Sequence, residues 1–180
     1  MIRRRVSAHG SRQLATIAAL VLSVAALACA PAPEGGAEAE DTMEPMATAA
    51  GVESAFQAFV DAWEAEDAEA VVATFTADGV MFDPVPPGKF SGSEGIRGLT
   101  TETFAAQDQI SIPYTEFEVQ THGAVAWSTA RYTYQATMGG ESIAEEGYVS
   151  MVWLLQDDGS YEASLFHASP IPVDPMAEGS

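Results

Sequence analysis

Basic residues and cysteine are scarce in this chain. Its 180 residues include 7 Lys and Arg against 26 Asp and Glu, which gives a formal net charge of −19 at pH 7. A surface so rich in carboxylates repels phosphate backbones, so we expect no nucleic-acid partner. The one cysteine, Cys29, has no second thiol in the chain to pair with.

Sequence patterns of metal and nucleotide sites are also missing. Outside the N-terminal region the chain has no cysteine and only two histidines, His122 and His167, so we expect no transition-metal site. No loop has the alternating ligands of an EF-hand, and no serine lies in a nucleophile elbow. The glycines at 92, 95 and 98 follow no convincing long strand, so they do not form a phosphate-binding fingerprint. We therefore expect no cofactor.

Cys29 follows an arginine cluster and an apolar run of about 15 residues, which is shorter than the roughly 20 that span a membrane. This segment resembles signal peptides that are cleaved before a cysteine, which is then acylated. The resemblance implies a signal peptide over 1–28, lipidation of Cys29, and an extracytoplasmic protein anchored to a bacterial membrane. The alternatives are an uncleaved anchor or an ordinary secretory signal, and the latter would leave a lone thiol in an oxidising compartment.

The segment 29–50 contains prolines, glycines and acids but no aromatic residue. It cannot bury enough apolar area to offset the entropy lost on ordering, so we predict a flexible tether. Prolines also mark residues 170–180 as a loose tail. The remaining segment, 51–169, has the size of one domain.

Helical spacing dominates the first half of this domain. Apolar side chains recur at three- and four-residue intervals over 52–66, which predicts an amphipathic helix. A short second helix is predicted over 67–75 and a strand over 79–83. After a proline-rich loop, Ser93 is expected to cap a third helix that ends near residue 106.

The second half of the domain has the pattern of strands. Apolar alternation over 110–119 changes parity near Thr115, which predicts a β-bulge and a bent strand. Further strands are predicted over 124–137, 143–156 and 161–169, with turn signals between them. Because the helices come early and the long strands late, we expect an α+β fold with helices covering one face of a curved sheet.

Short motifs at these elements resemble a known superfamily. They are Trp63 to Asp67, Phe75 to Val80, Gly92 to Arg97, Asp158 to Tyr161, and His167 to Ser169. In these motifs the chain is similar to the NTF2-like superfamily, in particular its SnoaL-like and DUF4440-type branch. The resemblance implies a cone of three helices over a curved mixed or antiparallel sheet, with a pocket open at one end and often a homodimer. The superfamily includes isomerases, dehydratases, cyclases, epoxide hydrolases and non-catalytic proteins, so the fold alone does not settle function.

Residues 81–85 and the following Ser91-Gly92 are similar to the ketosteroid isomerases. This resemblance places Asp83 at the position of their general base. A carboxylate at a strand end beside Phe82 would be partly desolvated, which would raise its proton affinity. The alternative is that Asp83 accepts backbone hydrogen bonds and starts a turn with Pro84.

Two positions depart from the isomerase pattern. Phe59 stands where those enzymes place a donor tyrosine, and Met151 stands where they place a protonated aspartic acid. Neither side chain donates a useful hydrogen bond to an enolate oxygen, so steroid isomerisation is not expected. We predict instead a largely apolar pocket wall, formed by Phe59, Trp63, Phe82, Met151 and Trp153, that binds a flat or hydrophobic small molecule. The alternative is that these residues only fill the core.

His167 is the second candidate for chemistry, as a base or proton shuttle near Asp83. It could equally be a hydrogen-bonded histidine in the sheet or at a dimer surface. Strict strand alternation places it on one face with Ala163 and Leu165. A gapless match to the isomerases turns Phe166 inward instead.

Two main hypotheses follow for the function of the domain. The first is a membrane-tethered module that binds a small hydrophobic or aromatic molecule in its cone. The second is an acid-base enzyme, an isomerase, dehydratase or hydrolase, that uses Asp83 and is assisted by His167. A structural homodimer with a filled cone is a third possibility. A polar cluster converging on Asp83 would favour the enzyme, and bonds from Asp83 only to loop amides would favour the binding module.

Overall fold

The structure, a computed structural model, describes residues 45–172. The predicted signal peptide, Cys29, most of the predicted tether and residues 173–180 of the predicted tail lie outside this range. No helix within 45–172 is both long enough and apolar enough to cross a membrane.

Two N-terminal helices form where apolar periodicity and capping residues predict them. Helix α1 (Ala49–Glu64) begins after Thr48, whose Oγ1 accepts a hydrogen bond from the Gly51 amide at 3.1 Å. Helix α2 (Ala68–Ala73) is capped in the same way by Asp67. The apolar side of α1 is buried, and its buried side chains are Val52, Phe56, Phe59, Val60, Ala62 and Trp63.

The folded domain begins at Ala47, four residues before the predicted boundary. Ala47 is buried, and its amide donates to the carbonyl oxygen of Gly123 at 2.8 Å. The Thr48 amide donates to the hydroxyl oxygen of Tyr161 at 2.7 Å. These two long-range bonds hold the residues before α1, so the stretch lacking aromatic residues does not mark the boundary of the domain.

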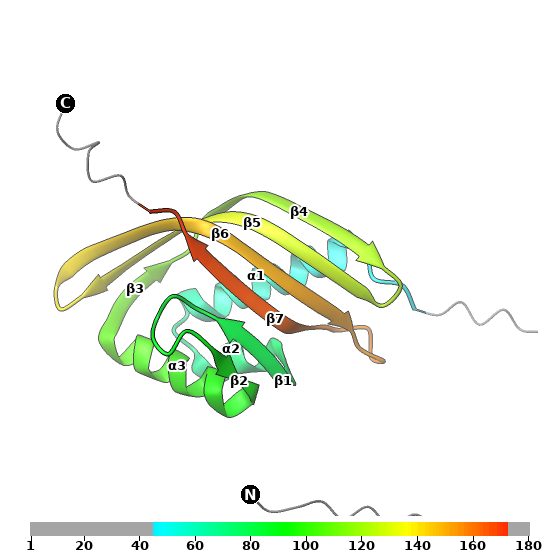
Figure 1. Cartoon of the computed structure of the whole chain (residues 1–180), viewed down its shortest axis with the longest axis horizontal. Coiled ribbons are helices and arrows are strands. Elements are labelled where there is room, and N and C mark those ends of the chain that lie inside the picture. Colours follow the sequence, from blue (N-terminus) through cyan, green and yellow to red (C-terminus); the bar gives the residue numbers. More distant parts are fainter. Residues whose placement is uncertain (1–44, 173–180) are drawn as a thin grey trace, which may run out of the picture. The chain divides into compact units, whose positions relative to one another are not determined.

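Seven strands form one sheet in the order β2-β1-β7-β6-β5-β3, and β4 pairs with β5 (Figure 1). Their bounds are β1 Phe75–Phe82, β2 Phe90–Ser91, β3 Gln107–Ser111, β4 Tyr114–His122, β5 Val125–Met138, β6 Glu141–Leu155 and β7 Tyr161–Pro170. The pair β1 and β7 is parallel and the other pairs are antiparallel, so the sheet is mixed. The last strand of the chain thus lies between the first strand and the central hairpin.

Three element boundaries differ from prediction. Strand β1 starts at Phe75, which pairs with Ala163 of β7, so α2 ends two residues earlier than expected. The predicted strand over 110–119 is divided between β3 and β4, whereas the bulge is confirmed by a register shift between Thr115 and Glu118. Helix α3 (Gly92–Ala106) has Ser91 at its N-cap instead of Ser93.

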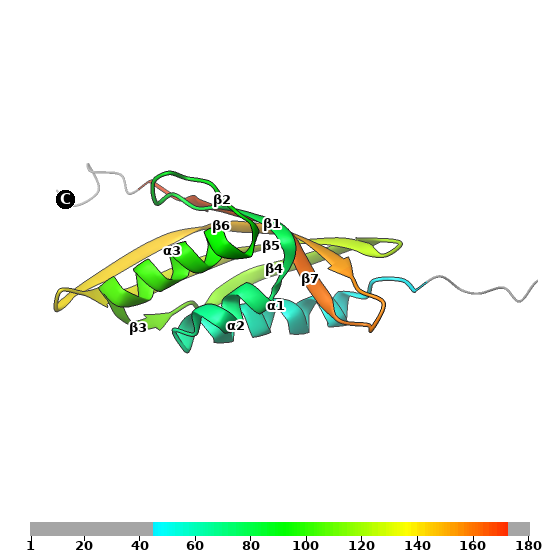
Figure 2. The same ribbon diagram turned by 90° about the horizontal axis from the view of Figure 1, so that it is seen from below.

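The three helices lie against one face of the curved sheet, which confirms the predicted α+β cone (Figure 2). The core between these layers includes Met81, Met151 and Trp153, whose side chains have 0–1% exposure. The indole nitrogen of Trp153 donates to the Ser128 hydroxyl oxygen at 2.9 Å, so this buried donor is satisfied.

Candidate binding cavity

A cavity of about 300 Å³ lies between the C-terminal half of α1, the inner face of β5 and β6, and the segment that follows β1. This volume is at the lower end of the range for small-molecule sites, roughly 300–1,000 Å³. Aromatic side chains dominate the wall, namely Phe56, Phe59, Trp63, Tyr114, Tyr132, Tyr134 and Phe166.

The rings of the aromatic wall pack against one another. Phe56 meets Tyr114 edge to face with ring centroids 4.8 Å apart, and Phe59 lies 5.4 Å from Phe166. Phe59 also contacts Trp63 at 6.2 Å. These separations are in the favourable range for aromatic pairs, so neighbouring rings restrain each other and the wall keeps its shape.

Asp83 follows β1 directly and lines the same cavity. It is half-buried, and its Oδ1 accepts a hydrogen bond from the Val85 amide at 2.9 Å. Burial raises the pKa of the Asp83 carboxyl above its ordinary value, and the negative charge of Glu145 raises it further. Asp83 therefore has both predicted positions: its Oδ1 stabilises the turn, and its side chain lines the cavity.

Two tyrosines of β5 add hydroxyl groups to the cavity wall beside Asp83. The Tyr132 hydroxyl donates to Glu145 Oε1 at 2.7 Å, and the Tyr134 hydroxyl donates to Gln107 Oε1 at 2.5 Å. Burial raises the pKa of Tyr134 to about 12, and burial together with Glu145 raises the pKa of Tyr132 further. Both phenols are therefore neutral at physiological pH.

Tyr132 and Tyr134 are not among the residues predicted to form the pocket wall, although a signal for their position was present in the sequence. The inward-facing positions before them on β5 are Ala126, Ser128 and Ala130, all small and buried. A change from small to large polar aromatic residues on one strand face indicates that the interior widens and becomes polar there.

The predicted pocket wall is partly corrected. Phe59 and Trp63 line the cavity, but Met151 and Trp153 are buried in the core away from it. Phe82 is also outside the cavity lining, and the ammonium group of Lys89 lies 5.8 Å from the centre of its ring. The reason is strand alternation: Met81 points into the core, so Phe82 points to the other face.

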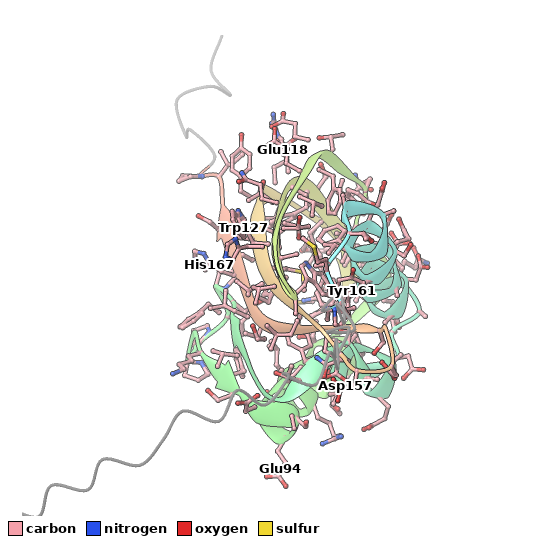
Figure 3. All side chains as sticks on the ribbon, turned by 90° about the vertical axis from the view of Figure 1, so that its right-hand side faces the viewer. Glu94, Glu118, Trp127, Asp157, Tyr161 and His167 are labelled. Carbon is pink, nitrogen blue, oxygen red and sulfur yellow. The ribbon has the colours of Figure 1, made fainter. Side chains whose placement is uncertain are left out.

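His167 is exposed and lies on the outer face of the sheet, on the side away from α1 in Figure 3. A register shift opposite Val152 and Trp153 breaks the alternation of β7, so Ala163 and Phe166 are both buried. Neither simple alternation nor a gapless match describes the whole strand. The predicted pair of His167 with Asp83 does not form. The imidazole ring of His167 instead packs edge to face with the ring of Phe82, with the two ring centroids 6.2 Å apart.

No group of three or more His, Cys, Asp or Glu side chains within 45–172 is arranged to hold a metal ion. The two arginines of this segment form ion pairs on the surface. Arg97 forms an ion pair with Glu69, and Arg131 forms one with Glu146 at 2.6 Å, both on the exposed surface.

The sequence profile of the SnoaL-like domain matches residues 52–174. The chain belongs to the SnoaL-like domain family. No curated protein sequence matches the chain. Domains of this family bind small-molecule ligands or catalyse reactions.

Solved structures share the fold of this SnoaL-like domain. A ketosteroid isomerase-like protein from Erwinia carotovora atroseptica has a TM-score of 0.61 and 23% identity, covering 69% of this chain and 96% of its own. A proposed dehydratase of the NTF2-like family from Streptomyces avermitilis has a TM-score of 0.61 and 20% identity, with the same coverage. ActVI-ORFA from Streptomyces coelicolor has a TM-score of 0.59 and 18% identity, covering 69% and 97%. At these identities the likeness establishes the NTF2-like fold.

Proposed function

We propose that this SnoaL-like domain binds a small hydrophobic or aromatic molecule in its cone. The observation that carries this proposal is the cavity of about 300 Å³ with an aromatic wall and a few polar groups at one end. Burial of an apolar ring in such a wall is favourable by roughly 25 cal/mol per Å² of area removed from water. A filled cone that serves only as a structural core is not supported by a cavity of this size.

Binding can be tested with naphthalen-2-ylmethanol, a neutral two-ring probe, titrated into the purified full-length protein by fluorescence. Ala168 lines the cavity and the adjacent Ser169 is exposed, so the two positions offer a matched pair of substitutions. Ala168→Phe should abolish binding because it fills the cavity, whereas Ser169→Phe should leave the affinity within about twofold. Equal binding by both variants, or no binding by the natural protein, would contradict the proposal.

A second candidate function is acid-base catalysis by Asp83 as an isomerase, dehydratase or hydrolase. It is supported by the raised pKa of Asp83 and by the Tyr132 and Tyr134 hydroxyl groups on the same cavity. These two phenols are hydrogen-bond donors, but they do not occupy the positions of the isomerase donors, where this chain has Phe59 and Met151. Their protons are engaged by Glu145 and Gln107, and Asp83 itself bonds to a loop amide, which makes binding the first choice.

Catalysis is tested with Asp83→Asn in a screen of substrates that carry an acidic C–H bond or a leaving group next to one. Loss of turnover with retained ligand binding would support an acid-base role. Unchanged turnover of every substrate together with retained binding would rule it out.

We also propose that Cys29 is acylated and holds the domain at the outer side of a bacterial membrane. The arginine cluster and the apolar run before Cys29 support this. Radiolabelled palmitate incorporation and membrane fractionation test it. Cys29→Ser should lose both the label and the membrane association.

We also propose that two copies of the domain form a homodimer through the outer face of the sheet. Trp127 and Tyr148 are 41% and 49% exposed on this face, and Val152 and Leu165 continue the row of Trp127 across the sheet. Trp127→Glu should convert a dimer to a monomer in sedimentation analysis, whereas Ala58→Glu on the exposed side of α1 should not.

A further inference from the structure

The charged side chains that line the cavity are both acidic. Asp83 and Glu145 contribute carboxylates to the lining, and no Lys, Arg or His does so. A third acid, Glu66, is close enough to raise the pKa of Tyr134 through its charge. The aromatic cavity therefore has a negative electrostatic potential at its polar end.

The basic side chains of residues 45–172 do not compensate this potential. The Arg97 and Arg131 guanidinium groups are paired with Glu69 and Glu146 on the surface. Lys89 lies over the ring of Phe82, which is outside the cavity lining. An anionic ligand would therefore enter the cavity without a partner of opposite charge and would be repelled by the two carboxylates.

The hydrogen-bonding capacity left at the polar end consists mainly of acceptors. The Tyr132 and Tyr134 hydroxyl protons are donated to Glu145 and Gln107. Asp83 uses Oδ1 for the Val85 amide, which leaves Oδ2 without a hydrogen-bond partner within the described chain. A ligand that supplies N–H donors fits these acceptors, although the buried Trp63 indole N–H, which has no hydrogen-bond partner within the described chain, is a free donor on the same lining.

We propose that the natural ligand is an aromatic compound with an ammonium or similar cationic group, which sits at Asp83 and Glu145 while the ring packs against Phe56, Phe59 and Trp63. This inference rests on the proposed binding function and adds the chemical class of the ligand. The cation makes charge-assisted hydrogen bonds to both carboxylates, of which Asp83 is half-buried and Glu145 is exposed. The rings of Tyr132 and Tyr134 add cation–π attraction. The raised pKa of Asp83 agrees with a carboxylate that lacks a positive partner in the free protein.

Three probes of the same shape test this inference on the full-length protein: naphthalen-2-ylmethanamine, which is an ammonium ion at pH 7, naphthalen-2-ylmethanol, which is neutral, and 2-naphthoate, which is an anion. The ammonium probe should bind at least about 10-fold more tightly than the alcohol, corresponding to about 1.4 kcal/mol, and the naphthoate should bind least. Asp83→Asn and Glu145→Gln should each remove most of the preference for the ammonium probe over the alcohol. Asp108→Asn and Glu141→Gln change the same charges at exposed positions outside the lining and serve as controls.

Each outcome separates the inference from the function on which it rests. Equal affinities for the ammonium and alcohol probes, or tighter binding of the naphthoate, would overturn the cationic ligand and leave the binding function intact. Equal losses in the cavity variants and the exposed controls would attribute the preference to the overall acidity of the protein and would also overturn it. No binding of any probe would overturn both proposals.

Discussion

The ring of Tyr132 on β5 crosses directly over Gly147 on β6. A Cβ atom on residue 147 would lie 2.5 Å from the Tyr132 hydroxyl oxygen and 2.7 Å from the carbonyl oxygen of Ser169. The two residues are paired in the sheet, so the missing side chain of Gly147 is what lets the phenol reach Glu145. The polar end of the cavity therefore depends on a glycine that does not line it.

Gly147→Ala should lower the free energy of unfolding by roughly 1–3 kcal/mol, since backbone and a ring must both move to make room. Gly98 is exposed in α3 with no neighbour within 4 Å of an added Cβ. Gly98→Ala should therefore stabilise the protein by about 0.5–1 kcal/mol. Urea unfolding of the two variants measures both effects, and a stable Gly147→Ala variant would contradict the packing described here.

Asp83 makes stability depend on pH in an unusual direction. Its pKa is raised in the folded protein, so its contribution is fully present below the unfolded-state pKa of about 3.9 and is lost as the pH rises through the folded-state pKa. Asp83→Asn does not ionise, so it removes this loss of stability, and its side-chain oxygen can still accept the hydrogen bond from the Val85 amide. The variant should gain stability over the natural protein as the pH rises from about 4 to 7.

Asp158 provides the control of opposite sign for this pH experiment. Its pKa is lowered by hydrogen bonds from the Ser160 hydroxyl and amide, at 2.6 and 2.9 Å. Its contribution is present above the unfolded-state pKa and is lost as the pH falls through the folded-state pKa. Asp158→Asn should therefore lose stability at pH 7 more than at low pH. Parallel pH profiles for the two variants would refute the assignment for Asp83.

The hydrogen bond from Trp153 to Ser128 should be important for the core. Both residues are 0–1% exposed, so Ser128→Ala leaves a buried indole N–H without an acceptor. The expected loss is about 1–3 kcal/mol in the free energy of unfolding. Ser150→Ala, at an exposed position of the neighbouring strand β6, should change stability by less than about 0.5 kcal/mol. Calorimetric melting of both variants gives the comparison.

Thr48 tests whether the domain begins before Gly51. Its hydroxyl caps α1, and its amide bonds to Tyr161 113 residues later in the chain. Thr48→Ala removes the cap and should cost about 1 kcal/mol. Ser54→Ala on the exposed side of α1 is the control, since its hydroxyl bonds only to a helix carbonyl. Equal stability of the two variants would mean that Thr48 belongs to a tether rather than to the domain.

Local patterns were sufficient to predict the helices and the inward position of part of the wall. Phe59 and Trp63 follow from the period of α1, whereas Asp83 was assigned through the resemblance of residues 81–85 to the ketosteroid isomerases. The bulge near Thr115 follows from a change of parity within one strand.

Positions that depend on pairing between distant strands were predicted poorly. The face of His167 is set by an irregularity where β7 meets β6, and the start of β1 is set by its partner in β7. Met151 and Trp153 were assigned to the wall because the sequence does not reveal how deep the cavity reaches along β6. Such features require the register of the whole sheet, which one strand alone does not contain.

The parallel pairing of β1 with β7 joins residues 75–82 to residues 161–170, and β7 also pairs with β6. A chain that emerges with its N-terminus first must therefore keep β1 and the apolar side of α1 uncovered until nearly all of its residues have appeared. Closure of the cone is a late and non-local step, which makes slow folding and aggregation of unfinished chains the expected weakness of this architecture. A nonsense mutation before residue 161 would leave an open half-sheet instead of a shorter working domain.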